Sequence, residues 1–233
     1  MVDYNVLVVD DEKEIRDAIE VYLRSTDNIN IIKAADGLEA LDILESTEIH
    51  VIILDIMMPK QDGIRTCIRI REKKNIPIIM LSAKSEETDK ILGLNIGADD
   101  YITKPFNPLE LVARVKSQLR RYVDFGNYSK NITKDQITID DLTINKKSHE
   151  VKLFGNEIKL TPIEYDILLL LAENRGRVFS SDEIYERVWQ EPAFNSENTV
   201  SVHIRRLRKK IEINTKDPRY VKVVWGVGYK IEK

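Results

Sequence analysis

The sequence predicts an α/β domain with a parallel sheet, followed by a smaller α+β domain. In the first half, short unbroken apolar runs alternate with amphipathic helical stretches, which is the order of elements typical of a parallel sheet. In the second half, short strands of alternating polarity precede three helices and a closing hairpin. The net charge is −6 over residues 1–124 and +3 over the remainder, which indicates that the two domains have different roles.

Residues 1–122 carry the α/β pattern. The expected strands cover 6–9, 30–34, 51–54, 76–81 and 100–103, and the expected helices cover 14–24, 37–45, 64–73, 86–96 and 109–121. Asn107-Pro108 opens the last of these helices with a capping residue followed by proline in the first turn. Strands that alternate with helices in this way form a parallel sheet covered on both faces.

The pattern changes after residue 122. Polar and turn residues without periodicity over 123–135 predict a linker. From 136 to 233 the expected strands cover 136–144, 150–154 and 157–160, the helices cover 161–173, 180–189 and 199–213, and the closing hairpin covers 220–231. Thr161-Pro162 caps and starts the first of these helices. A small sheet, three helices and a terminal hairpin describe a winged helix-turn-helix domain.

The composition is that of a globular protein outside the membrane. Hydrophobic residues make up 42% of the 233 residues and charged residues 32%, which excludes a disordered chain. No apolar stretch approaches the roughly 20 residues that cross a bilayer, and no basic segment precedes the first strand. Cys67 is the single cysteine, which excludes an internal disulfide and a zinc site built from several cysteines. We therefore expect a cytoplasmic protein with no membrane partner.

Charged and hydroxyl side chains follow four of the expected strands. Asp10 and Asp11 follow the first strand, Asp55 the third, Ser82 the fourth and Lys104 the fifth. The carboxyl ends of parallel strands lie at one edge of the sheet, where open α/β sheets bind their ligands. The sequence therefore predicts a site for a hard divalent cation and a phosphoryl group at this edge.

The chemistry of these side chains favours phosphoryl transfer to an aspartate. Magnesium is satisfied by one or two carboxylates together with phosphate oxygens and water, and it offsets the repulsion between crowded carboxylates. A carboxylate such as that of Asp55 attacks a phosphoryl group to form an acyl phosphate. Lys104 is expected to pair with the added charge, and Ser82 is expected to donate a hydrogen bond to it.

Residues 3–122 resemble the receiver domain of two-component response regulators. The resemblance is carried by 8–12 (VVDDE), 54–63 (LDIMMPKQDG), 81–83 (LSA) and 97–106 (GADDYITKPF). It implies a flavodoxin-like fold with a five-stranded parallel sheet. It also implies that Asp55 takes a phosphoryl group from a cognate sensor histidine kinase, with Mg2+ as the cofactor.

The same resemblance implies a role for each residue of the site. Asp11, Asp55 and the backbone carbonyl of Met57 are expected to bind Mg2+ directly, and Asp10 is expected to lie close to the ion. Ser82 and Tyr101 are expected to form the switch pair that responds to phosphorylation. The bond between Lys104 and Pro105 is expected to be a cis peptide, since X–Pro bonds are the ones for which the cis form is accessible.

Charges of both signs around the last two strands match the OmpR/PhoB-like (winged-helix) subfamily, whose members form a symmetric dimer after phosphorylation. Lys90 is expected to pair with Glu110, and Asp100 with Arg114, across a twofold axis, so that each pair occurs twice. The expected dimer face comprises Lys90, Ile91, Leu94, Asp99, Asp100, Glu110, Ala113, Arg114 and Arg121.

The segment 198–211 resembles the recognition helix of the same subfamily. Val200, Ile204, Leu207 and Ile211 follow helical spacing and predict a core face, so the basic residues fall mainly on other faces. A basic helix of this kind suits the major groove of double-stranded DNA. The expected DNA-binding residues are Thr199, Ser201, His203, Arg205, Arg206, Lys209, Lys210 and Tyr229. No metal ligands are spaced around His203, so we expect it at the surface or facing DNA.

The closing hairpin departs from the subfamily at one position. Trp225 stands before Gly226-Val227-Gly228-Tyr229, where the subfamily commonly has arginine. An arginine enters a narrow minor groove through its charge, and tryptophan lacks that charge, so we assign Trp225 no base contact. Tryptophan at this place, together with 178–181 (VFSS), resembles glycopeptide-resistance (VanR-type) regulators.

These observations predict a DNA-binding transcriptional regulator that is switched by phosphorylation of Asp55. We expect the phosphorylated protein to dimerise, to bind paired half-sites arranged as direct repeats in promoter DNA, and to act with RNA polymerase. One alternative is an aspartate-nucleophile phosphohydrolase, but its acid/base carboxylate would stand at Met57, so we expect no turnover enzyme beyond slow autodephosphorylation. A second is a regulator switched by a partner without phosphorylation. A dinucleotide site lacks its glycine-rich turn, because acidic residues fill the first loop.

Overall fold

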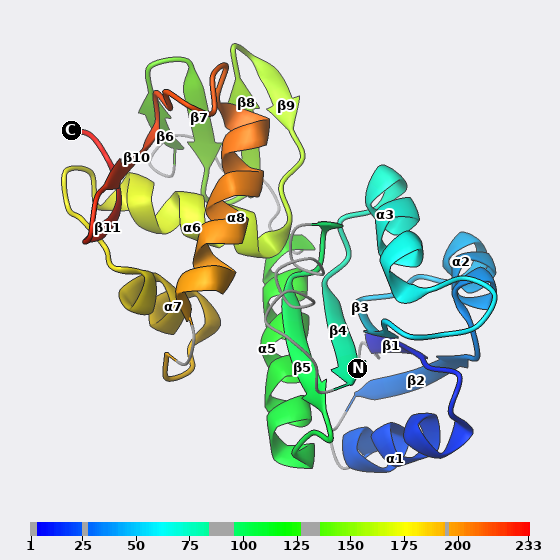
Figure 1. Ribbon diagram of the computed structural model, residues 1–233. Coiled ribbons are helices and arrows are strands. Elements are labelled where there is room, and N and C mark those ends of the chain that lie inside the picture. Colours follow the sequence, from blue (N-terminus) through cyan, green and yellow to red (C-terminus); the bar gives the residue numbers. More distant parts are fainter. Residues whose placement is uncertain (1–3, 25–27, 84–95, 127–135, 194–195) are drawn as a thin grey trace. The chain divides into compact units, whose positions relative to one another are not determined.

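The computed structural model describes residues 4–24, 28–83, 96–126, 136–193 and 196–233, and the side chains of 121 and 123–126 are not among them. The chain divides into two compact units, Met1–Val123 and Asp124–Lys233. Each unit is described by itself below, with the element labels of Figure 1. In the part of the chain that the structure describes, no helix is long and apolar enough to cross a membrane.

The first unit is built on a five-stranded parallel sheet, as the sequence predicts. The strands are β1 (Tyr4–Val9), β2 (Ile29–Ala34), β3 (Val51–Asp55), β4 (Ile78–Ala83) and β5 (Asp100–Lys104), in the spatial order β2-β1-β3-β4-β5. Every residue of β3 is buried, as expected for a central strand with both faces covered. The order reverses between β1 and β3, and open α/β sheets bind ligands at the carboxyl ends of strands at such a point.

Helices cover both faces of this sheet (Figure 1). They are α1 (Lys13–Arg24), α2 (Gly37–Ser46), α3 (Gly63–Lys73) and α5 (Pro108–Gly126). α1 and α5 share one apolar core in which Ile19, Leu23 and Leu111 pack against the sheet. Asp36 and Asp62 cap α2 and α3 through backbone N–H groups of the first turn. The predicted helix over 86–96 lies, apart from its last residue, outside the described residues.

The last helix of the first unit is longer than the sequence predicts. α5 continues to Gly126, so residues 123–126 are helical although they were assigned to the linker. The segment 109–125 contains neither proline nor glycine, and the first strong helix breaker is Gly126 itself. Residues 127–135 of the predicted linker lie outside the described part of the chain.

The second unit has the predicted winged helix-turn-helix elements. A four-stranded antiparallel sheet contains β6 (Gln136–Ile139), β7 (Leu142–Asn145), β8 (Glu150–Leu153) and β9 (Asn156–Ile158). Three helices follow, α6 (Pro162–Glu173), α7 (Ser181–Trp189) and α8 (Ser196–Ile211), and β10 (Val221–Val224) pairs with β11 (Gly228–Ile231). One core that contains Ile163, Trp189 and Leu207 joins these helices to both sheets.

The clearest differences from the prediction in the second unit are at the first strand and at the third helix. The stretch 136–144 was read as one strand, but a turn at Asp140-Asp141 divides it into β6 and β7. Asp140 adopts a positive φ of 50°, which aspartate tolerates better than most residues. The third helix starts three residues earlier than expected, at Ser196, and ends at Ile211 rather than 213. Turn residues at 140–141 were the signal that could have revealed the hairpin.

Candidate functional site

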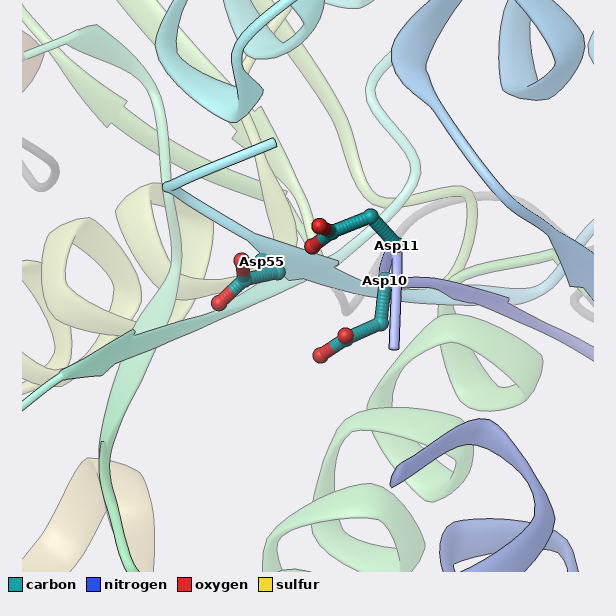
Figure 2. Close-up of side chains that lie close together, drawn as sticks. All are labelled: Asp10, Asp11 and Asp55. Carbon is teal, nitrogen blue, oxygen red and sulfur yellow. The ribbon is translucent and has the colours of Figure 1, made fainter. Parts of the chain in front are cut away.

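The predicted carboxylates lie together at the carboxyl edge of the first sheet (Figure 2). Asp10 and Asp11 follow β1, and Asp55 ends the neighbouring strand β3. One ligand oxygen from each of these residues lies within 4.8 Å of the other two. Asp10 and Asp55 are buried, whereas Asp11 is exposed. The cluster therefore joins two buried charges to one that solvent reaches.

Lys104 completes this cluster, which we call the acidic edge (Asp10, Asp11, Asp55 and Lys104). Its Nζ lies 2.7 Å from Oδ2 of Asp10 and 2.9 Å from Oδ1 of Asp55. Burial acts to lower the pKa of Lys104, but its hydrogen bonds to the two carboxylates outweigh that effect and raise the pKa. Lys104 is therefore a fixed positive charge at neutral pH, held between two buried carboxylates. The peptide bond to Pro105 is cis, as expected.

Backbone groups pack closely around Asp55. Its Oδ2 accepts a hydrogen bond from the backbone N–H of Met57 at 3.1 Å. A Cβ placed on Gly63 would lie 2.0 Å from the backbone oxygen of Asp55, so only glycine allows α3 to start this near the site. Burial raises the pKa of the Asp55 carboxyl, Lys104 opposes that rise, and the Asp10 and Asp11 carboxylates add to it.

The donor set of the acidic edge suits a hard divalent cation. All three acidic side chains offer carboxylate oxygens, the ligands that Mg2+ prefers, and Asp11 is exposed to solvent. Three carboxylates and one ammonium group leave a negative surplus, which a bound cation would reduce. The backbone N–H of Met57 donates to Asp55. The expected binding of Mg2+ by the Met57 carbonyl stays a prediction.

The predicted switch residues lie on β4 and β5, the two strands that follow β3 in the sheet. Ser82 is the last but one residue of β4, next to β3, and is buried, and its hydroxyl donates to the backbone oxygen of Ala83 at 2.9 Å. Tyr101 lies on the edge strand β5, with a relative exposure of 9%. Ser82 is therefore near the acidic edge, while Tyr101 lies one strand further away, on β5. Their roles as a switch pair stay a prediction.

Two residues of the expected dimer face, Asp99 and Asp100, make contacts within this chain that the prediction did not include. Asp99 is fully buried, because its carboxylate pairs with Arg71 at 2.6 Å and accepts from the backbone N–H of Ile78 at 2.9 Å. The assignment of Asp99 to a surface was therefore wrong. Asp100 and Arg114, expected to pair between two chains, form an ion pair within this chain at 2.8 Å.

Two other residues of the expected dimer face are exposed. Glu110 and Ala113 are exposed on α5, and Glu110 also pairs with Arg114 at 3.0 Å. Lys90, Ile91 and Leu94 lie outside the described residues, as does the side chain of Arg121. The dimer face stays a prediction for the remaining residues.

In the second unit, α8 presents a narrow basic face. Arg205 and Lys209 are exposed one turn apart, and Thr199 and Ser201 are partly exposed nearer the helix start. Tyr229 on β11 is partly buried, and the backbone of β11 pairs with that of Phe179. Contact of these residues with DNA stays a prediction.

Three other residues predicted to contact DNA make contacts within the domain instead. His203 is fully buried and packs on Trp189 with ring centroids 5.4 Å apart, so its expected surface position was wrong. Arg206 is 9% exposed and pairs with Glu164 at 3.2 Å. Lys210 pairs with the same carboxylate at 2.6 Å. The cause is the rotation of α8, which turns these positions towards α6 and α7.

The sequence reading missed two residues that position these elements. Glu164 on α6 is a fully buried carboxylate, and Arg208 donates from its guanidinium to the backbone oxygen of Val221, which ties α8 to β10. The Thr-x-x-Glu spacing of a capping box could have drawn attention to Glu164. Trp225, in the turn after β10, is 88% exposed, so it does not cover the core.

Comparisons with known proteins agree with this division into two units. Residues 6–116 match the family model described as "Response regulator receiver domain", and residues 155–231 match "Transcriptional regulatory protein, C terminal". The chain is 49% identical to the regulatory protein VanR of Enterococcus faecium and 45% identical to VanRc of Enterococcus gallinarum, in each case over 98% of both chains. It is also 34% identical in sequence to response regulator DrrB, a Thermotoga maritima OmpR/PhoB homologue, over 100% of both chains. The crystal structure of DrrB superposes on this chain with a TM-score of 0.52.

Proposed function

The chain belongs to the two-component response regulators that join a receiver domain to a DNA-binding domain, and from this premise we propose that Asp55 is its phosphoacceptor. The observation that carries the proposal is the contact of Lys104 with both Asp55 and Asp10 at a single strand edge. Among the described carboxylates of the first unit, Asp55 combines burial, a paired lysine and a central parallel strand.

In the proposed reaction an oxygen of the Asp55 carboxylate attacks the phosphorus atom of a phosphohistidine on a sensor histidine kinase. A new P–O bond forms, the P–N bond breaks, and the electron pair leaves with the imidazole nitrogen. Lys104 already lies 2.9 Å from the Asp55 carboxylate, so it is placed to pair with the charge that the phosphoryl group adds. Water reaches the site on the side of the exposed Asp11.

We propose that Asp10, Asp11 and Asp55 hold Mg2+ at the acidic edge. When bound, the ion offsets the negative charge of the carboxylates and of the phosphoryl oxygens. Met57 stands two residues after Asp55, where an acid/base carboxylate would be needed to turn over small phosphate esters. Its thioether moves no protons, which supports a phosphoacceptor that is not a turnover phosphatase.

The proposed output is DNA binding by a phosphorylated homodimer. Arg205 and Lys209 on α8 are exposed and basic, which suits contact with phosphates in or beside a major groove. Glu110 and Ala113 offer an exposed part of α5 for the partner copy. We propose that the dimer binds two half-sites in direct repeat and from there contacts RNA polymerase.

The phosphoacceptor is tested by incubating the full chain with Mg2+ and acetyl phosphate and measuring its intact mass. We expect one added phosphoryl group on the wild type and none on D55N. D62N is a matched control, because Asp62 caps α3 and is not one of the three clustered carboxylates, and asparagine also caps helices well. An added phosphoryl group on folded D55N, or none on the wild type, would refute the assignment.

The output is tested by selecting duplexes from a random pool with phosphorylated and unphosphorylated protein. We expect phosphorylation to enrich duplexes that carry the same short motif twice in one orientation. Light scattering of the same samples should show dimers only after phosphorylation. Enrichment of single motifs by monomers would contradict the proposed paired binding.

A further inference from the structure

Glu164 is a buried carboxylate that binds two cations of the DNA-facing helix. It lies on the first turn of α6 and has no exposed surface. Its Oε1 lies 3.2 Å from Nε of Arg206, and its Oε2 lies 2.6 Å from Nζ of Lys210. Because Arg206 and Lys210 are one turn apart on α8, a single carboxylate on α6 fixes both the rotation and the axial position of that helix.

Helix capping does not explain why this carboxylate is buried. Glu164 accepts from the backbone N–H of Thr161 at 2.9 Å in a capping box. Glu183 does the same for Ser180 at the start of α7, and its side chain remains 42% exposed beside Arg177. The two glutamates therefore share a capping role, but only Glu164 is enclosed and contacts α8.

The cations that Glu164 holds alternate with those that face solvent. Arg206 and Lys210 have side-chain exposures of 10% and 32%, and Lys210 also donates to the backbone oxygen of Lys159 at 3.0 Å. Arg205 and Lys209, each one residue earlier, are exposed. Of the five Arg and Lys residues of α8, Glu164 thus pairs with Arg206 and Lys210, Arg208 donates to Val221, and Arg205 and Lys209 are the exposed pair.

We propose that Glu164 is a positioning residue that withholds Arg206 and Lys210 from DNA phosphates and presents Arg205 and Lys209 to them. This inference rests on the proposed role of α8 in DNA binding. Its consequence is electrostatic: sequence-independent affinity grows with the number of phosphates that are neutralised, so withholding two cations limits binding to arbitrary DNA. Glu164 would then help the domain to discriminate between its operator and other sequences.

The test measures how the affinity of the full chain for a short duplex of arbitrary sequence depends on salt, by fluorescence anisotropy. In the E164Q variant the side chain keeps its shape and a capping oxygen but loses the charge that holds Arg206 and Lys210. We expect tighter binding at low salt and a slope of log K against log salt that is steeper by about one to two, since each phosphate contact contributes about 0.9. The double variant E164Q/R206M should lose about half of that gain.

E183Q is the matched control, because it makes the same change at the other capping box, where the carboxylate pairs with Arg177 and not with a cation of α8. We expect its slope to equal that of the wild type. R206M and K210M should also leave the slope unchanged, whereas R205M and K209M should each reduce it by about 0.9. Circular dichroism under the same conditions identifies variants that do not fold.

The outcomes separate this inference from the function on which it rests. If R205M and K209M leave the slope unchanged, α8 is not the DNA-facing helix and both proposals fail. If they reduce it but folded E164Q has the slope of the wild type, the inference about Glu164 alone is overturned. If E164Q does not fold, the R206M and K210M variants test the inference instead. A decrease of about 0.9 in the salt-dependence slope of either variant would show that the replaced cation contacts DNA, and it would overturn the inference.

Discussion

The two units each enclose a cluster of charges, and the clusters have opposite sign. The acidic edge of the first unit combines three carboxylates with Lys104, whereas the α6–α8 cluster of the second unit combines the Glu164 carboxylate with Arg206 and Lys210. Each contains groups that are nearly or fully buried, so each must balance charge locally. The acidic edge retains a negative surplus and the α6–α8 cluster a positive one.

The difference shows how buried charge is used in the two units. The acidic edge includes the exposed Asp11, and under the proposed function its negative surplus would be reduced by a bound Mg2+. In the second unit the Glu164 carboxylate is matched by Arg206 and Lys210, and Arg205 and Lys209 remain exposed on α8. Under the proposed function the first cluster is therefore completed by a ligand, whereas the carboxylate of the second cluster already has its cations within the domain.

The largest expected effect on stability comes from removing the positive charge of Lys104 from the acidic edge. K104M leaves the buried carboxylates of Asp10 and Asp55 facing each other without a counter-charge. Removing one partner of a buried ion pair typically costs 3–5 kcal/mol, so we expect the free energy of unfolding of the first unit to fall by about 3 kcal/mol in EDTA. Excess Mg2+ should restore part of that loss, as followed by urea unfolding with circular dichroism.

K73M is the control for this variant. Lys73 also pairs with a carboxylate, that of Glu45 at 3.7 Å, but the two side chains are 74% and 73% exposed. Exposed ion pairs contribute about 0–1 kcal/mol, so K73M should change the unfolding free energy little and should show no additional response to Mg2+. Equal losses in the two variants would contradict the claim that the acidic edge depends on its buried lysine.

A smaller effect is expected from Mg2+ on the wild type, and it should be confined to the first unit. At about 100 times its Kd, a ligand that binds only the folded state stabilises it by about 2.7 kcal/mol. Both tryptophans of the chain, at 189 and 225, lie in the second unit, so their fluorescence follows that unit alone. We expect Mg2+ to shift the circular dichroism transition and to leave the tryptophan transition in place.

An equal shift of both transitions would break the comparison, because it would mean that the cation is not specific to the acidic edge. Mg2+ titration of D55N provides the control. That variant lacks one of the three carboxylates, so we expect a weaker response.

The smallest effect is expected from a substitution that touches neither cluster. W225A removes a side chain that is 88% exposed in the turn between β10 and β11. Surface substitutions away from special features usually change stability by less than about 0.5 kcal/mol, and we expect the same here. Because Trp189 remains, its fluorescence still reports urea unfolding of the second unit. A loss above about 1 kcal/mol would indicate that Trp225 packs in the folded domain.

The acidic edge could be predicted because strand ends leave few alternatives. Parallel strands with buried faces place the residues that follow them at one edge, whatever the details of packing. Asp10, Asp55 and Lys104 were therefore expected together, and the structure brings them within ion-pair distance. The capping residue Thr161 was predicted on similarly local grounds, since a cap depends on its own helix turn.

The helix faces were predicted less well, because rotation of a helix depends on what packs against it. The spacing of Val200, Ile204 and Leu207 identified one buried stripe on α8, but α7 and α6 also cover His203 and Arg206. In the first unit, the adjacent acidic residues Asp99 and Asp100 were both predicted to lie on the dimer face. The position of Arg71 on α3, 28 residues away in sequence, turns Asp99 into a buried group.

The sequence by itself determined the order of elements, the two-unit organisation and the residues at the strand ends, because these depend on periodicity, caps and the pleat of single strands. Only the tertiary structure decided which charges of α8 and of the β4–β5 region face solvent. Those positions depend on partners distant in the chain, Glu164 for Arg206 and Arg71 for Asp99. A buried charge must have a counter-charge, and only the folded chain shows which residue supplies it.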